Sequence, residues 1–175
     1  LRVCDDLMNN FEDKEKGGFF FTSDQHEQLF YRPKSISDDS VPSGLVYATD
    51  TLLYMGFISG NQKYIEAAHG ALDFIYKSID NNLTSSVSAI NLLREDNLEK
   101  EIIIVRTNKK TWKKITNSEE YYGRCIIFIE NELQNLPDYI AYKESKGEFT
   151  SYHCKGMTCQ TPKLSFEDFM DTLKT

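Results

Sequence analysis

The hydrophobic pattern of this chain changes near residue 100. Between residues 45 and 79 apolar side chains recur every three or four positions, in two stretches separated by Ser59, Gly60 and Asn61. That period is typical of amphipathic helices, and so short a connection makes them antiparallel neighbours. Beyond residue 100 the apolar residues form two short runs, 102–105 and 125–129, which are typical of buried strands. The sequence therefore predicts a helical part over residues 1–99 and a small α/β part over residues 100–175.

Local start and stop signals define the individual elements. Gly60 ends one helix, Asn61 caps the next, and Ser165 with Asp168 has the spacing of a capping box. A helix between the two apolar runs makes them a parallel β-α-β unit. We predict helices over residues 2–11, 44–59, 61–79, 83–94 and 109–121 and from 165 onward, and strands over 19–21, 29–31, 102–105, 125–129, 139–142 and 149–153.

The connection from residue 17 to residue 44 combines glycines, aromatic residues and charges, and it supplies the candidate binding residues. Its acidic, basic and imidazole side chains could anchor a polar ligand, with nearby phenylalanines as a stacking wall. The candidates are Asp24, His26, Glu27, Arg32, Lys34 and Asp38. The alternative interpretation is a surface loop whose charges pair with one another, and the pattern does not separate the two.

Five further residues of this connection form a structural motif. Gly17 and Gly18 allow backbone conformations that a Cβ would forbid. Pro42, Ser43 and Gly44 indicate a turn followed by a helix start, with Ser43 as the N-cap.

The sequence predicts neither a metal site nor a cofactor. Adjacent Asp38 and Asp39 could bind a divalent cation, but neighbours in an extended segment point apart. Cys154 and Cys159 enclose four residues and could form a disulfide or half of a zinc site. A second ligand pair is missing, so a pair of buried reduced thiols is the favoured interpretation, with a redox or zinc role as the lesser alternative.

Charge and composition exclude two classes of partner. Residues 1–100 hold 16 Asp and Glu against 9 Lys and Arg, and this acidic part would repel a nucleic-acid backbone. No apolar run approaches the roughly 20 residues of a membrane-spanning helix. Four cysteines are too few for a disulfide framework in a chain of 175 residues, so we expect reduced thiols and a cytoplasmic location.

Two blocks of residues share a pattern with a known family. The first consists of Gly17, Gly18, Phe19, Phe20, Thr22, Ser23, Asp24, His26, Glu27, Arg32, Pro33, Lys34, Asp38, Pro42, Ser43 and Gly44. The second, near the end of the chain, consists of Tyr152, Cys154, Thr158, Cys159 and Pro162. Together they resemble the YyaL-like, spermatogenesis-associated thioredoxin-domain proteins. One departure is that family members often follow the Pro-Ser-Gly with Asn and a small residue, where this chain has Leu45 and Val46.

The resemblance implies a fold and a context. Proteins of this family resemble a thioredoxin-fold domain followed by an (α/α)6 toroid of the six-hairpin glycosidase and sugar-epimerase type. This chain would then be the C-terminal part of such a protein: mainly α, with helical hairpins of a partial toroid over residues 1–99 and a small α/β appendage over residues 100–175. Because the faces meant for other helices would be apolar and uncovered, we expect the fragment to self-associate or to be marginally stable.

The same resemblance implies a function. The connection over residues 17–44 would lie at the toroid mouth, where related enzymes bind sugars. We therefore expect a ligand-binding region for a small polar molecule such as a sugar, with catalysis and the reaction left open. The alternative is a non-catalytic scaffold or interaction module for the thioredoxin-fold domain of the same protein.

Overall fold

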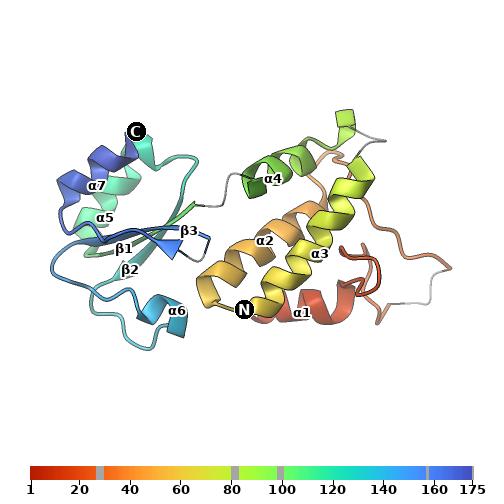
Figure 1. Cartoon of the computed structure of the whole chain (residues 1–175), viewed down its shortest axis with the longest axis horizontal. Helices are drawn as coiled ribbons and strands as arrows, with labels where there is room; N and C mark the ends of the chain where they lie inside the picture. The colour runs from red at the N-terminus through yellow and green to blue at the C-terminus, as the bar shows by residue number, and fades with distance from the viewer. Residues whose placement is uncertain (27–29, 80–82, 98–100, 157, 175) are drawn as a thin grey trace. The chain divides into compact units, whose positions relative to one another are not determined.

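The computed structural model describes residues 1–26, 30–79, 83–97, 101–156 and 158–174 (Figure 1). The chain divides into two compact units, Leu1–Leu98 and Glu99–Thr175. Within the described residues, no helix has both the length and the apolar character needed to cross a membrane.

The first unit is helical. Its elements are α1 (Arg2–Phe11), α2 (Gly44–Ser59), α3 (Gln62–Ser78), a 3₁₀ turn (Leu83–Ser85) and α4 (Val87–Asn97). Gly60 has a φ of 67° and ends α2, and the Asn61 side chain accepts a hydrogen bond from Lys63 N to cap α3. The two helices lie side by side as an antiparallel hairpin against which α1 and α4 pack (Figure 1). The predicted helical hairpin is therefore confirmed.

The core of this unit is formed by the facing stripes of α2 and α3. Leu52, Leu53, Ala68 and Ile75 are fully buried there. Phe19, from the connection between α1 and α2, joins the same core and fixes that connection to the helices.

The connection between α1 and α2 differs from the predicted hairpin. Among its described residues the only strand-type pairing is the isolated bridge between Glu12 and Phe19, so the strand predicted over residues 19–21 is wrong. The strand predicted over 29–31 begins outside the described residues, and Phe30 and Tyr31 are not in a strand. The two phenylalanines are held by tertiary contacts and not by strand pairing. Phe19 is buried in the core, and the ring of Phe20 lies under the guanidinium of Arg32.

The second unit is a four-stranded mixed sheet with helices. Its strands are β1 (Glu101–Thr107), β2 (Cys125–Glu130), β3 (Thr150–Lys155) and β4 (Thr158–Cys159), in the order β2-β1-β3-β4. β1 is parallel to β2 and antiparallel to β3, and β3 is antiparallel to β4. The connection from β1 to β2 contains α5 (Lys109–Thr116), which confirms the predicted parallel β-α-β unit.

Two helices cover one face of this sheet. α5 and the closing helix α7 (Phe166–Leu173) lie on the same side (Figure 1). Ile103 and Val105 of β1 pack there with Ile115, Phe169 and Leu173. Since successive strand residues point to opposite faces, Ile102, Ile104, Tyr152 and Cys154 face the other side.

The expected fold class is wrong. We expected a mainly α chain forming part of an (α/α)6 toroid, whereas the chain is α/β, because the second unit is built on a mixed sheet that also includes β3 and β4. The strand predicted over residues 139–142 is also wrong: a short helix, α6 (Asp138–Ala141), occupies this position. Its first turn forms on Pro137, whose carbonyl oxygen accepts hydrogen bonds from Ile140 N and Ala141 N.

Candidate functional site

Two candidate binding residues, Arg32 and Lys34, use their cationic groups to make hydrogen bonds within the first unit. Arg32 Nη2 donates to the carbonyl oxygens of Thr22 (2.6 Å) and Asn10 (3.1 Å). Lys34 Nζ lies 2.6 Å from Asp13 Oδ2 and 2.8 Å from the carbonyl oxygen of Gly17. These contacts hold the connection against the end of α1, so part of each cation's hydrogen-bonding capacity serves the fold.

Aromatic rings surround the same two cations. The guanidinium of Arg32 lies 4.1 Å from the ring centre of Phe20, and Lys34 Nζ lies 4.1 Å from that of Phe74. Both cations line an open hollow of about 590 Å³, which also includes the exposed rings of Phe30 and Tyr31. We call this the aromatic hollow; Phe20 and Phe30, two phenylalanines of the connection, line it, and their role as a stacking wall stays a prediction.

Asp38 lies elsewhere and has a structural environment. Its carboxylate accepts hydrogen bonds from Ser43 N (3.0 Å), Ser88 N (2.8 Å) and the Ser88 hydroxyl, which join the start of α2 to α4. Burial by itself would raise the pKa of Asp38, but the hydrogen bonds from Ser88 and Ser43 outweigh it and lower the pKa. Asp38 lines a different hollow, of about 470 Å³, so the structure does not bring Arg32 and Asp38 together.

The remaining residues of the connection are exposed, structural or outside the described part of the chain. Asp24 and His26 are exposed, and Glu27 lies outside the described residues. Gly17 and Gly18 have φ values of 73° and 82°. Ser43 caps α2 by accepting a hydrogen bond from Val46 N, as predicted, with Pro42 before it and Gly44 as the first helical residue.

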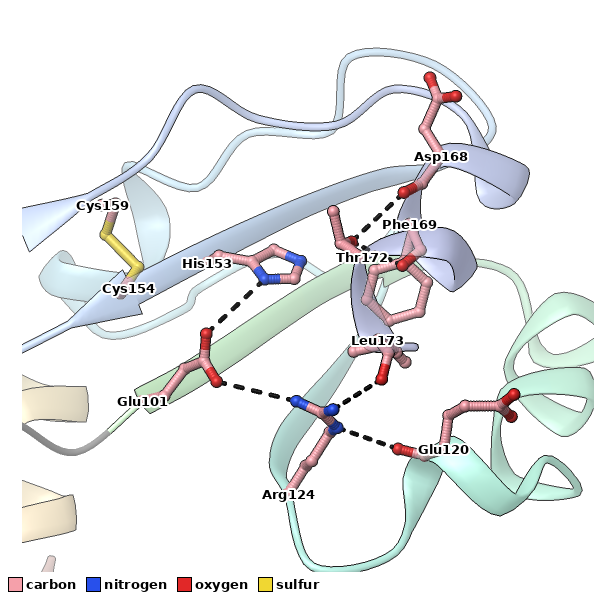
Figure 2. Close-up of polar contacts among 10 residues, drawn as sticks. All are labelled: Glu101, Glu120, Arg124, His153, Cys154, Cys159, Asp168, Phe169, Thr172 and Leu173. Atoms are coloured by element: carbon pink, nitrogen blue, oxygen red, sulfur yellow. Dashed lines mark hydrogen bonds and ion pairs between the residues drawn. A yellow bond between two sulfur atoms is a disulfide. The ribbon is translucent and has the colours of Figure 1, made fainter. Parts of the chain in front are cut away.

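A second candidate site lies in the other unit, where Cys154 and Cys159 form a disulfide (Figure 2). The expectation of reduced thiols is therefore wrong for this structure. The register places Cys154 of β3 directly opposite Cys159 of β4, across a turn at Gly156, whose φ is 54°. Cys154 is 1% exposed, whereas Cys159 is only partly buried. An external thiol would therefore reach Cys159 first.

Lys143 lies beside the accessible sulfur. Its Nζ donates to Cys159 Sγ at 3.0 Å and lies 5.4 Å from the ring centre of Tyr152. The Tyr152 hydroxyl donates to the carbonyl oxygen of Glu144 (2.8 Å), which fixes the backbone next to Lys143. Burial lowers the pKa of Lys143. A cationic nitrogen at this distance would stabilise a thiolate on Cys159 after reduction.

The opposite face of the sheet holds a polar cluster with a structural role. Arg124 donates to the carbonyl oxygens of Leu173 (2.6 Å) and Glu120 (3.1 Å) and lies 3.9 Å from Glu101 (Figure 2). His153 Nδ1 lies 4.0 Å from the same carboxylate. Burial lowers the pKa of His153, although Glu101 opposes this, so we treat the imidazole as neutral at pH 7 and the contact as no ion pair. The cluster fastens α7 to the sheet.

Neither a metal centre nor a known family can be assigned from the remaining observations. The described residues contain no group of three or more His, Cys, Asp or Glu side chains that could hold a metal ion. No family model matches the sequence, and no curated protein matches it. The family resemblance therefore stays a prediction based on the residues quoted for it.

Proposed function

We propose that the second unit performs thiol–disulfide exchange, with Cys159 as the exchanging sulfur. The observation that supports this most strongly is the 3.0 Å contact between Lys143 Nζ and Cys159 Sγ. The unequal burial of the two cysteines supports it as well, because the more accessible sulfur, that of Cys159, can meet a partner while Cys154 stays buried. We place the reaction in the cytoplasm, where disulfides are usually transient and catalytic or redox-sensing.

In the exchange, two electrons pass from a partner dithiol to the disulfide of this chain. A thiolate of the partner attacks Cys159 Sγ, the bond between the two cysteines breaks, and the electron pair stays on Cys154 Sγ, which takes up a proton. The second partner thiolate then attacks the partner's own sulfur in the mixed disulfide and releases Cys159 as a thiolate beside Lys143. The partner is oxidised to a disulfide and the chain is reduced to a dithiol. The reverse sequence reduces a partner disulfide.

Replacing Lys143 by methionine tests this proposal. We expect Lys143→Met to slow alkylation of Cys159 in the reduced protein at pH 7 about tenfold, because the thiolate loses its cation. The rate is measured with iodoacetamide and peptide mass spectrometry, which separates Cys159 from Cys4 and Cys125. The matched control is Lys146→Met, an exposed lysine of the same loop, for which we expect no change.

Two results would contradict the exchange function. The first is equal alkylation rates in the Lys143→Met and Lys146→Met proteins. The second is a Cys154–Cys159 disulfide that stays intact in an excess of reduced glutathione, because a structural disulfide resists the glutathione pool.

A second candidate function is the binding of a small polar ligand, such as a sugar, by the first unit. It is supported by the aromatic hollow, whose volume of about 590 Å³ is suitable for a small molecule. We expect monosaccharides to shift the NMR signals of Arg32 and Lys34, and Phe30→Ala to abolish the shifts without unfolding, because Phe30 is fully exposed. A panel of monosaccharides that leaves these signals unchanged would instead favour the scaffold interpretation.

The scaffold interpretation draws on the bonds that Arg32, Lys34 and Asp38 make within the chain. In that case the partner is a thioredoxin-fold domain of a longer protein. Self-association of the chain also stays a prediction.

A further inference from the structure

Arg106 is a buried cation with an incomplete set of hydrogen bonds. It is the second-last residue of β1 and is 6% exposed. Nη2 donates to the carbonyl oxygen of Asn131 at 3.0 Å, Nη1 makes a long contact of 3.4 Å with that of Lys143, and Nε has no partner. A guanidinium has five N–H donors, and the hydrogen bonds of Arg106 use two of them.

A buried guanidinium normally has a carboxylate or another anion beside it, because removing a charge from water is costly. Across the described ranges of the chain, the hydrogen bonds of Arg106 go to carbonyl oxygens alone, and no carboxylate forms an ion pair with it. No described carboxylate therefore neutralises this positive charge by direct contact.

Arg106 also lines a hollow at a position favourable for ligand binding. The hollow has a volume of about 360 Å³, and Asn131, Gln134, Asn135, Glu144 and Ser145 line it as well. Arg106 lies at the carboxyl end of β1, and Asn131 directly follows β2, which is parallel to β1. In open α/β sheets, ligands bind beyond the carboxyl ends of the parallel strands.

We propose that this hollow binds the oxyanion of a small molecule, a carboxylate or a phosphate group, against the guanidinium of Arg106. The planar fork of an arginine matches the geometry of both groups. The side-chain amides of Gln134 and Asn135 supply neutral donors at the rim. The site is distinct from the exchange at Cys159 and does not depend on it.

Glu144 is the group that opposes such a ligand. It is exposed and lines the same hollow, so its carboxylate repels an incoming anion. Its replacement by glutamine should therefore strengthen binding, whereas a new carboxylate at Gln134 should weaken it.

The test is titration of the full chain with inorganic phosphate and, separately, with acetate, at constant ionic strength set with chloride. NMR chemical shifts of the Arg106 guanidinium and the neighbouring backbone amides report binding. We expect saturable shifts, affinity about fivefold higher in Glu144→Gln and about fivefold lower in Gln134→Glu, since an exposed charge changes an interaction by up to about 1 kcal/mol. The stronger of the two anions identifies the ligand group as phosphate or carboxylate.

A matched control separates a local site from the net charge of the protein. Asn117→Asp adds the same charge on an exposed residue after the C-terminal end of α5, and it should leave the affinity unchanged. Equal weakening by Asn117→Asp and Gln134→Glu would overturn the proposal, as would the absence of saturable shifts with both anions in the wild-type and Glu144→Gln proteins. Cys159 alkylation is unaffected by either result, so the two proposals fail independently.

Discussion

Replacing Gly17 by alanine is expected to lower the free energy of unfolding of the first unit by about 3 kcal/mol or more. Gly17 has a φ of 73°, which is unfavourable for a residue with a side chain. A Cβ at this position would also lie 2.1 Å from the carbonyl oxygen of Gly70 in α3, and a helix backbone cannot move aside cheaply. The connection would have to separate from α3, taking Phe19 out of the core.

Two other glycines provide graded controls. Gly18 has a φ similar to that of Gly17, but a Cβ on it would meet side-chain atoms of Phe74 and Leu45 at 3.1 and 3.4 Å. Side chains can move more easily than a helix backbone, so we expect Gly18→Ala to lower the free energy of unfolding by less. Gly44 lies in a helix, and a Cβ on it would have no atom within 4 Å. We therefore expect Gly44→Ala to leave the free energy of unfolding unchanged or to raise it. Hydrogen exchange of α2 and α3 measures the losses. The fluorescence of Trp112, which lies in the other unit, should not change. Equal losses of stability for the three substitutions would contradict the steric explanation.

Replacing Asp38 by asparagine is expected to destabilise the first unit by about 2 kcal/mol, because hydrogen bonds to a charged group are lost. Asparagine has one acceptor oxygen, so either Ser43 N or Ser88 N would face an amide nitrogen. Asp39→Asn is the matched control, since Asp39 is an exposed neighbour. Urea unfolding followed by hydrogen exchange of α4 measures the difference, and similar effects of the two substitutions would contradict the role of Asp38.

The pKa of Asp38 gives this effect a pH dependence. Because hydrogen bonds lower its pKa in the folded state, the carboxylate stabilises the fold above the ordinary aspartate pKa of about 4, and this stability is lost as the pH falls through the folded-state pKa. Burial by itself would raise the pKa of Asp13, but the bond to Lys34 and the backbone hydrogen bonds from Lys16 and Glu15 together lower it. We expect the first unit to lose stability in acid, and the Asp38→Asn protein to lose less.

The sequence predicted most helices because the signals for them are local. The stripe through Ala68 and Ile75, the stop at Gly60 and the cap at Ser165 each depend on residues within one or two turns. The fold class was wrong because the extent of a sheet depends on pairing between distant residues. β3 is the antiparallel neighbour of β1, and nothing local to Thr150–Lys155 indicates that register.

The site residues also divide into those with a local sequence signal and those that only the folded chain brings together. Gly17, Gly18 and Ser43 were recognisable because glycine pairs and caps have local meaning. Lys143 and Arg106 were not, because only the folded sheet brings Lys143 to Cys159 and leaves Arg106 buried without a carboxylate. Arg32 and Asp38 appeared to be one cluster in the sequence, but the turn at Ser43 and the start of α4 recruit Asp38 to a different place.

The strand order β2-β1-β3-β4 has a consequence for the order of folding. The α2–α3 hairpin joins residues that are close in the sequence, and contacts of this kind form quickly. β1 also needs β3, which is made after β2, so one edge of the apolar run Ile102, Ile103, Ile104 and Val105 stays unpaired after the helical unit is complete. A strand with an unpaired edge can mispair with other chains on the ribosome.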